Sequence, residues 1–161
     1  MEAKPWIVLI VFFFITLGTG SVAAYLTDRG VRQWYPQLRK PPGTLPPSVF
    51  GPVWTTLYVL MGISAWLIWR EYGWSGGRSA LVLFSGQLAL NVAWSGVFFS
   101  ARLPGVAFAE IVILWLAILF NIVVFYWLLP LAAWLLVPYF LWVTYAVYLN
   151  FGIWRLNRDA A

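Results

Sequence analysis

Long apolar runs separated by short polar segments make up most of this chain of 161 residues. The runs cover residues 6–25, 51–69, 79–99, 106–128 and 131–154. Each is close to the ~20 residues that an α-helix needs to cross ~30 Å of hydrocarbon. The pattern predicts an all-α integral membrane protein, multi-pass, with a five-transmembrane-helix bundle as its single domain over residues 1–161.

The one long connection, residues 27–50, differs in composition from the runs beside it. It is rich in proline, which lacks an N–H donor and restricts the residue before it. The prolines are Pro36, Pro41, Pro42, Pro46 and Pro47. We therefore expect a structured first loop that caps a ligand cavity at one end of the bundle. The simpler alternative is a membrane-surface connector whose prolines only stop helices.

The composition agrees with a membrane protein and excludes several kinds of site. Hydrophobic residues make up 63% of the chain and charged residues 9%, whereas soluble domains carry about a quarter charged residues. The chain has no cysteine and no histidine, so it lacks disulfides, the usual zinc ligands and the commonest protein ligands of haem iron. No carboxylate pair or phosphate-binding loop is present. We expect no metal site and no obligatory cofactor.

Basic residues are distributed unequally between the two sides of a five-span topology, in a chain of net charge +5. One side carries Lys4, Arg70 and Arg78. The other carries Arg29, Arg32, Arg39, Lys40, Arg102, Arg155 and Arg158. Since basic residues gather in cytoplasmic loops, the first loop and the C-terminus are predicted to be cytoplasmic. The charge fits anionic membrane lipid better than nucleic acid as a partner.

Glu110 is an ionisable residue inside a predicted span, and an intramembrane carboxylate is a functional candidate. It also lies near enough to the start of its run to reach water or Arg102, which leaves a structural explanation equally open.

A polar stripe follows the third run, where Gln87, Asn91 and Ser95 recur at every fourth position with Trp94 beside them. Such residues often hydrogen-bond between membrane helices, which is the favoured interpretation for Gln87. Asn91 beside Trp94 also suits a heteroaromatic ligand, because an amide and a large π surface then face the same space.

Five motifs in order resemble the translocator protein / tryptophan-rich sensory protein family (TspO/MBR, the peripheral benzodiazepine receptor family). They are WYxxLxKP at residues 34–41, GPVWxxLYxxMG at 51–62, GQLALNxAW at 86–94, VPYFLW at 137–142 and LNxxxWRxN at 149–157. Together they extend over nearly the whole chain. We expect a prokaryotic-type member.

The resemblance implies a five-helix bundle, often a homodimer, with a ligand cavity beneath the first loop. It implies binding of porphyrins such as protoporphyrin IX and haem, and of synthetic benzodiazepine-type ligands. Trp54 and Trp142 match tryptophans linked to light-dependent porphyrin breakdown in some bacterial members. The ligand-binding residues carried over by position are Tyr35, Pro46, Trp54, Tyr58, Asn91, Trp94, Glu110, Trp142, Ala146 and Leu149.

The chain departs from the family pattern in the first loop, which commonly reads KPxWxPP. Gly43 stands where that tryptophan would be, and Leu45 replaces the first of the paired prolines. Part of the aromatic lid is therefore missing, which predicts a less ordered loop.

Three functions follow from these observations. The first is a membrane receptor or sensor for porphyrins, which could also assist their transport. The second is an enzyme that degrades porphyrin in light through Trp54 and Trp142. The third, a secondary transporter, has the least support, because the sequence offers one candidate acid and no internal repeat.

Overall fold

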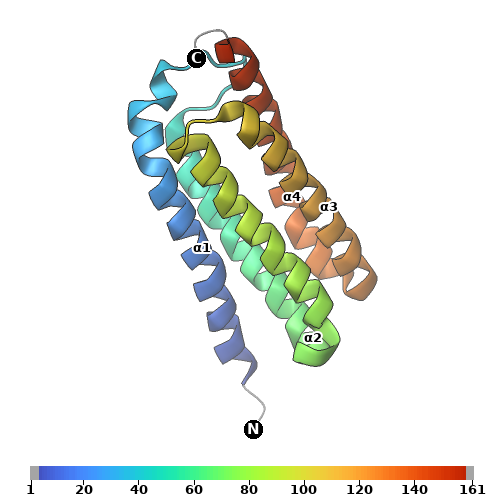
Figure 1. The fold of residues 1–161 in the computed structure, drawn as a ribbon. Coiled ribbons are helices and arrows are strands. Elements are labelled where there is room, and N and C mark those ends of the chain that lie inside the picture. The colour runs from blue at the N-terminus through green and yellow to red at the C-terminus, as the bar shows by residue number, and fades with distance from the viewer. Residues whose placement is uncertain (1–3, 159–161) are drawn as a thin grey trace.

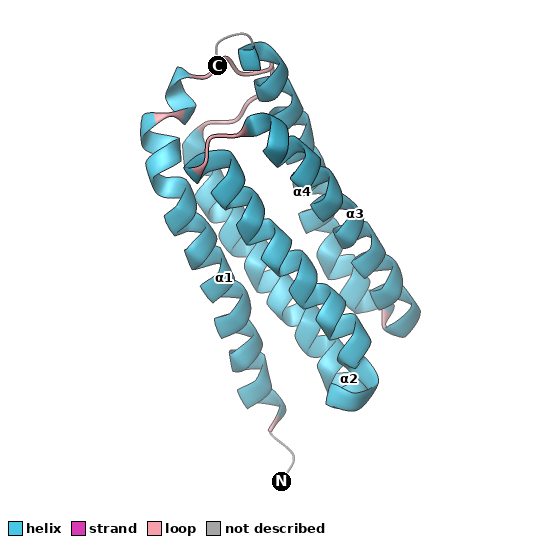
Figure 2. Cartoon of the chain, viewed as in Figure 1, coloured by secondary structure: helices cyan, strands magenta, loops and turns pink. Residues whose placement is uncertain are grey.

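Long helices aligned along one axis form nearly all of the computed structural model, which describes residues 4–158 (Figure 1). Figure 2 shows short loops between the helices, and residues 4–158 contain no strand. Four helical segments are long and apolar enough to cross a membrane, which confirms an all-α, multi-pass membrane protein. The elements are α1 (Pro5–Gln33), the 3₁₀ turn η1 (Tyr35–Gln37), α2 (Pro47–Ser95), the π-helical turn η2 (Gly96–Ser100), α3 (Pro104–Leu128) and α4 (Pro130–Asn157).

The prediction of five separate helices is wrong as a count, because the predicted helices 51–69 and 79–99 lie in one continuous helical segment, which α2 and the π-helical turn η2 form together. The predicted turn at residues 70–78 is helical except at Gly73, where φ is 65° and ψ is −170°. Glycine adopts these angles because it has no Cβ. Figure 1 shows α2 folding back on itself, and we call residues 47–72 its first arm and residues 74–95 its second arm.

The first helix is longer than the predicted 6–25, and the loop is correspondingly shorter than 27–50. Helix α1 continues through the polar residues up to Gln33. An i,i+4 contact between Asp28 and Arg32 supports this extension, with 2.7 Å between the carboxylate and the guanidinium. Gly30 lies against the Phe99 backbone, where an added Cβ would be 2.5 Å from the carbonyl oxygen.

Proline marks the first residue of each long helix. Pro5, Pro47, Pro104 and Pro130 begin α1, α2, α3 and α4. Proline fits this position because the N–H that it lacks would have no partner inside the helix. Helices α2, α3 and α4 therefore begin before the predicted residues 51, 106 and 131, and α4 extends beyond the predicted residue 154.

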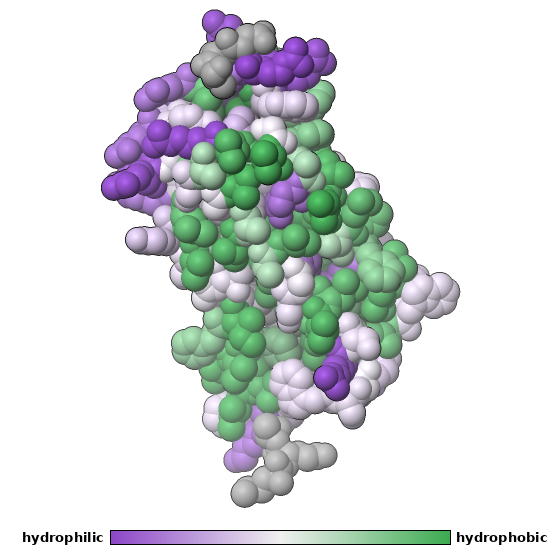
Figure 3. Space-filling model, viewed as in Figure 1, coloured by the Kyte–Doolittle hydropathy of each residue, from purple (hydrophilic) through white to green (hydrophobic). Residues whose placement is uncertain are grey.

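Apolar side chains fill the bundle and also cover its outside. Met61 and Phe125 are fully buried, and Phe125 stacks on Phe84 with 6.1 Å between ring centroids. Outward-facing Phe14 and Trp127 are 76% and 82% exposed, as expected of side chains in contact with lipid. Figure 3 shows this apolar surface between polar ends, and hydrophilic side chains gather at the end that carries the first loop.

Helix α1 approaches α2 closely at two glycines. A Cβ on Gly20 would lie 2.6 Å from two ring carbons of Tyr58. A Cβ on Gly62 would lie 2.9 Å from Phe13 and from the Thr16 hydroxyl. Small residues allow such contact between membrane helices. Thr16, Gly20 and Ala24 follow one another at four-residue spacing along α1 and so lie on one face of it.

The first loop is fastened to the C-terminal half of α4. The Tyr145 hydroxyl donates to the Gly43 carbonyl (2.9 Å) and accepts from the Leu45 N–H (3.1 Å). The Asn157 side chain bonds both the N–H (3.0 Å) and the carbonyl (2.9 Å) of Arg39. These contacts hold the loop in place although it lacks the tryptophan that the family pattern has at position 43.

Candidate functional site

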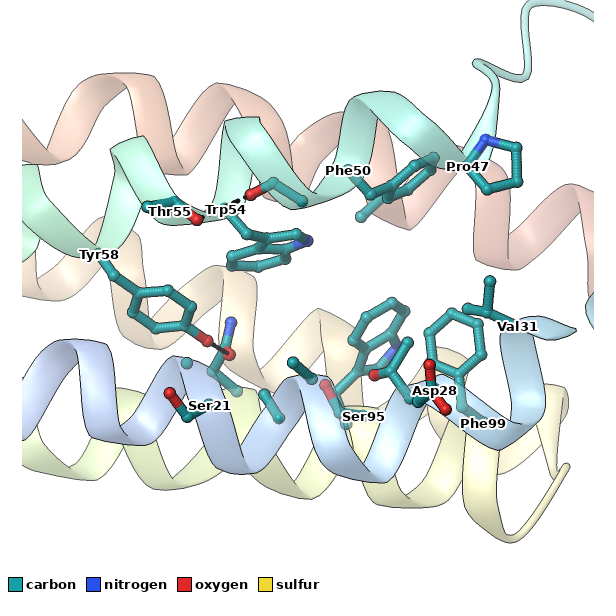
Figure 4. A pocket seen from close by; sticks show the side chains of 18 of the residues that line it. Ser21, Asp28, Val31, Pro47, Phe50, Trp54, Thr55, Tyr58, Ser95 and Phe99 are labelled. Carbon is teal, nitrogen blue, oxygen red and sulfur yellow. Dashed lines mark hydrogen bonds between the residues drawn. The ribbon is translucent and has the colours of Figure 1, made fainter.

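A cavity of about 560 Å³ lies between α1, both arms of α2 and α4, at the end of the bundle that carries the first loop. Figure 4 shows its two long walls, with Ser21, Asp28 and Val31 on α1 opposite Pro47, Phe50 and Trp54 at the start of α2. Its volume is within the range of ~300–1,000 Å³ typical of small-molecule sites.

Three tryptophans contribute much of the apolar lining. Trp54 stacks on Tyr58 with 5.6 Å between centroids, and Trp142 packs edge-on against Phe50, also at 5.6 Å. Trp94 lies on the second arm of α2 and is 9% exposed. Large aromatic faces from three helical segments thus surround the same space, an arrangement that suits a planar apolar ligand.

The deep end of the cavity is closed by a hydrogen-bonded chain between α2 and α4. The Tyr58 hydroxyl donates to the Asn91 side-chain oxygen at 2.6 Å. The Asn91 amide lies 3.2 Å from the Tyr139 hydroxyl, which is itself buried. Because each group is tied to the next, this wall keeps a fixed shape.

Trp94 is oriented by a second buried chain. Its indole N–H donates to Asn150 at 2.9 Å, and the Asn150 amide donates to the Pro104 carbonyl at 2.7 Å. Asn150 is 1% exposed, so these bonds are shielded from water. The ring plane of Trp94 therefore depends on a contact between α4 and the first turn of α3.

Charged side chains reach the cavity at its loop end, where Asp28 and Arg32 line it. Arg32 contacts one oxygen of Asp28 through Nε at 2.8 Å and through one Nη at 2.7 Å. Both side chains are largely exposed. The cavity is therefore amphipathic, with an aromatic interior and a charged mouth.

Tyr35 connects the cavity with the first loop. Its ring is 6% exposed and lies beneath the Lys40 ammonium, 4.8 Å from the ring centroid. Desolvation raises the pKa of the Tyr35 hydroxyl above its usual value, and Tyr145 nearby raises it further. The hydroxyl is therefore uncharged at neutral pH and adds no negative charge to the cavity.

The structure brings together most of the site residues predicted from the sequence. The predicted residues that line the cavity are Tyr35, Trp54, Tyr58, Asn91, Trp94, Trp142 and Ala146.

Three predicted site residues lie elsewhere. Pro46 precedes the lining residue Pro47, and Leu149 lines a small adjoining pocket of about 30 Å³. Glu110, on α3, is absent from the lining of the cavity. Both its carboxylate oxygens are buried without a hydrogen-bond partner among the described residues, and no ion pair there joins it to Arg102.

The contribution of α1 to the cavity was missed at the sequence level. Hydropathy shows only that α1 is apolar, and not which side faces a ligand. The spacing of small residues was the available signal, because Gly20 and Ala24 lie on that side. The residues contributed by α1 are Leu17, Gly20, Ser21, Ala23, Ala24, Thr27, Asp28, Val31 and Arg32.

Within residues 4–158, no group of three carboxylate, histidine or cysteine side chains is placed to hold a metal ion. The lining offers aromatic faces, an amide and an ion pair. These groups favour binding of a planar apolar molecule by surface contact.

Comparison with known proteins identifies a family and several similar chains. The TspO/MBR family model matches residues 10–155. The chain is 39% identical to the Translocator protein of Homo sapiens, over 97% of this chain and 94% of that protein. It is 36% identical to the Tryptophan-rich protein TspO of Archaeoglobus fulgidus, covering 92% and 96% of the two chains. It is 38% identical to the Tryptophan-rich sensory protein of Cereibacter sphaeroides, covering 78% and 77%.

Proposed function

The chain belongs to the TspO/MBR family, and from this premise we propose that it is a membrane receptor for porphyrins such as protoporphyrin IX and haem. The observation that carries the proposal is the cavity of about 560 Å³ walled by Trp54, Trp94 and Trp142. A tetrapyrrole is a large planar π system, and aromatic side chains bind such a surface by stacking and edge contacts. Porphyrin is here a ligand and not a catalytic cofactor.

The proposed topology has five crossings. The two arms of α2, residues 47–72 and 74–95, each exceed the ~20 residues needed to cross the bilayer. The start of α1 and the end of α4 lie at opposite ends of the bundle in Figure 1, as an odd number of crossings requires. The excess of basic residues near the first loop supports a cytoplasmic loop and a cytoplasmic C-terminus. Since the chain lacks cysteine, single cysteines at Arg39 and Ser75 with an impermeant maleimide test this orientation.

Quenching of tryptophan fluorescence by protoporphyrin IX tests the proposed binding. We expect saturable quenching that Trp54→Ala or Trp142→Ala weakens. Trp134→Ala is the matched control for Trp142, because Trp134 is also on α4 but is 63% exposed and absent from the lining. Linear quenching that is equal in all variants would mean that porphyrin only partitions into detergent or lipid, and the proposal would fail.

A second candidate function is light-dependent porphyrin degradation. It is favoured by the position of Trp54 and Trp142 in the lining, where an indole can donate an electron to an excited porphyrin. Illumination of the purified protein with protoporphyrin IX in air tests it by the appearance of product. If Trp54→Phe and Trp142→Phe form product at the parent rate, neither indole takes part.

The homodimer implied by the resemblance remains a prediction. Mass measurement of the protein in detergent, corrected for bound detergent, would distinguish one copy from two.

A further inference from the structure

We propose that Arg32 is a carboxylate-binding residue at the mouth of the cavity, which therefore selects anionic amphiphiles over neutral ligands of the same shape. The inference rests on the proposed function, because it assumes that the apolar body of the ligand occupies this cavity. The inference adds how the charged edge of that ligand is recognised at the mouth of the cavity.

The cavity separates apolar and charged lining along its length. Gly20 faces the ring of Tyr58 at the deep end, and Arg32 lies twelve residues further along α1. At 1.5 Å per residue these positions are ~18 Å apart. Asp28 and Arg32, the charged residues of the lining, both lie at the loop end. A ligand with an aromatic body and a carboxylate on one edge matches this polarity in one orientation.

Arg32 has hydrogen-bonding capacity to spare. Its Nε and one Nη both contact a single oxygen of Asp28. A guanidinium has five N–H donors in a planar fork, and the structure shows no acceptor for the second Nη among the described residues. The guanidinium can therefore bind a second carboxylate while its contact with Asp28 remains.

Among the residues that line the cavity, Arg32 is the cation that offsets the negative charge of the mouth. The mouth of the cavity lies at the C-terminal end of α1, where the helix dipole places partial negative charge, and Asp28 adds a full negative charge. Arg32 offsets this local negative charge. Arg32→Gln should then weaken binding of an anionic ligand, whereas Asp28→Asn should strengthen it. A role confined to supporting the helix predicts no such opposite effects, because either substitution breaks the same ion pair.

The experiment compares protoporphyrin IX, which has two carboxylates, with its neutral dimethyl ester, in nanodiscs of zwitterionic lipid. Affinity for the ester reports whether each variant still folds and keeps the cavity. Arg29→Gln is the matched control, since it removes an equal charge from the neighbouring exposed position, which does not line the cavity.

We expect Arg32→Gln to weaken protoporphyrin IX binding about fivefold, as the loss of an exposed ion pair of ~1 kcal/mol requires. Affinity for the ester should not change, Asp28→Asn should strengthen protoporphyrin IX binding, and added salt should reduce the preference for the acid. An unchanged ratio of acid to ester affinity in Arg32→Gln would refute the assignment. So would an equal loss in Arg29→Gln, which would mean that only general surface charge matters. If the parent binds neither porphyrin saturably, the proposed function fails, and this inference fails with it.

Discussion

Gly20 lies where α1 meets the deep wall of the cavity. Gly20→Ala should therefore disturb both the packing of α1 on α2 and the shape of the cavity. The new methyl would lie 2.6 Å from two ring carbons of Tyr58, whereas carbon atoms in good contact are ~3.5–4.0 Å apart. The groups must therefore separate by about 1 Å. The ring has little freedom to move, because Tyr58 is bonded to Asn91 at 2.6 Å and stacked on Trp54.

Comparison with Gly18→Ala isolates the free-energy cost of overpacking in Gly20→Ala. Gly18 lies on the same helix, and a methyl group added there would have no atom within 4 Å, so the substitution gains only the helix propensity of alanine, up to ~1 kcal/mol. Both substitutions share that gain. The difference between them is then the cost of overpacking, ~1–3 kcal/mol.

Unfolding in mixed micelles with increasing denaturing detergent measures the difference, and porphyrin quenching measures the effect on the cavity. Gly20→Ala should unfold earlier than Gly18→Ala and bind protoporphyrin IX less tightly. Equal unfolding midpoints with unchanged binding would show that α1 can move away from Tyr58 at little cost. The close approach would then not determine the shape of the cavity.

Three further predictions concern the backbone, the buried polar chain and pH. Gly73→Ala should destabilise the protein by ~1–3 kcal/mol in the same unfolding assay, because its φ and ψ are accessible almost only to glycine, whereas Gly86→Ala, with open space around it, should not. Asn150→Leu should cost ~1–3 kcal/mol by removing the partner of the Trp94 indole, and this cost should shrink in a Trp94→Phe background; equal costs in both would disprove the coupling. Because burial raises the pKa of Tyr35 in the folded state, its stabilisation is complete below ~pH 10 and is lost as pH rises through the folded-state pKa. Unfolding midpoints should therefore fall more steeply above ~pH 10 for the parent than for Tyr35→Phe, and parallel curves would contradict this assignment.

The sequence predicted the class of the protein and the tryptophan-bearing walls of the cavity because both depend on local patterns. Long apolar runs predict membrane helices directly, and Trp54, Asn91 and Trp142 stand within motifs that mark the family. Hydropathy did not predict the true end of α1, since the polar residues up to Gln33 remain helical through contacts such as Asp28 with Arg32.

Two features depended on information that a local pattern does not contain. The segment around Gly73 was predicted as a turn of several residues, because glycine and polar residues cluster there. In the structure the reversal is confined to Gly73, and the residues on both sides of it are helical. The contact of Asn157 with Arg39 joins residues 118 positions apart, and no periodicity indicates such a partner.

The attachment of the first loop to α4 has a consequence for the order of synthesis. The loop residues leave the ribosome early, but the side chains that fasten them follow 100 to 118 residues later. At ~5–20 residues per second, this delay is ~5–24 s. During that interval the first helices exist without the α4 side chains that hold the first loop in place. The wall of the cavity that α4 contributes and the contacts that fasten the loop are therefore completed together, after the other walls have been made.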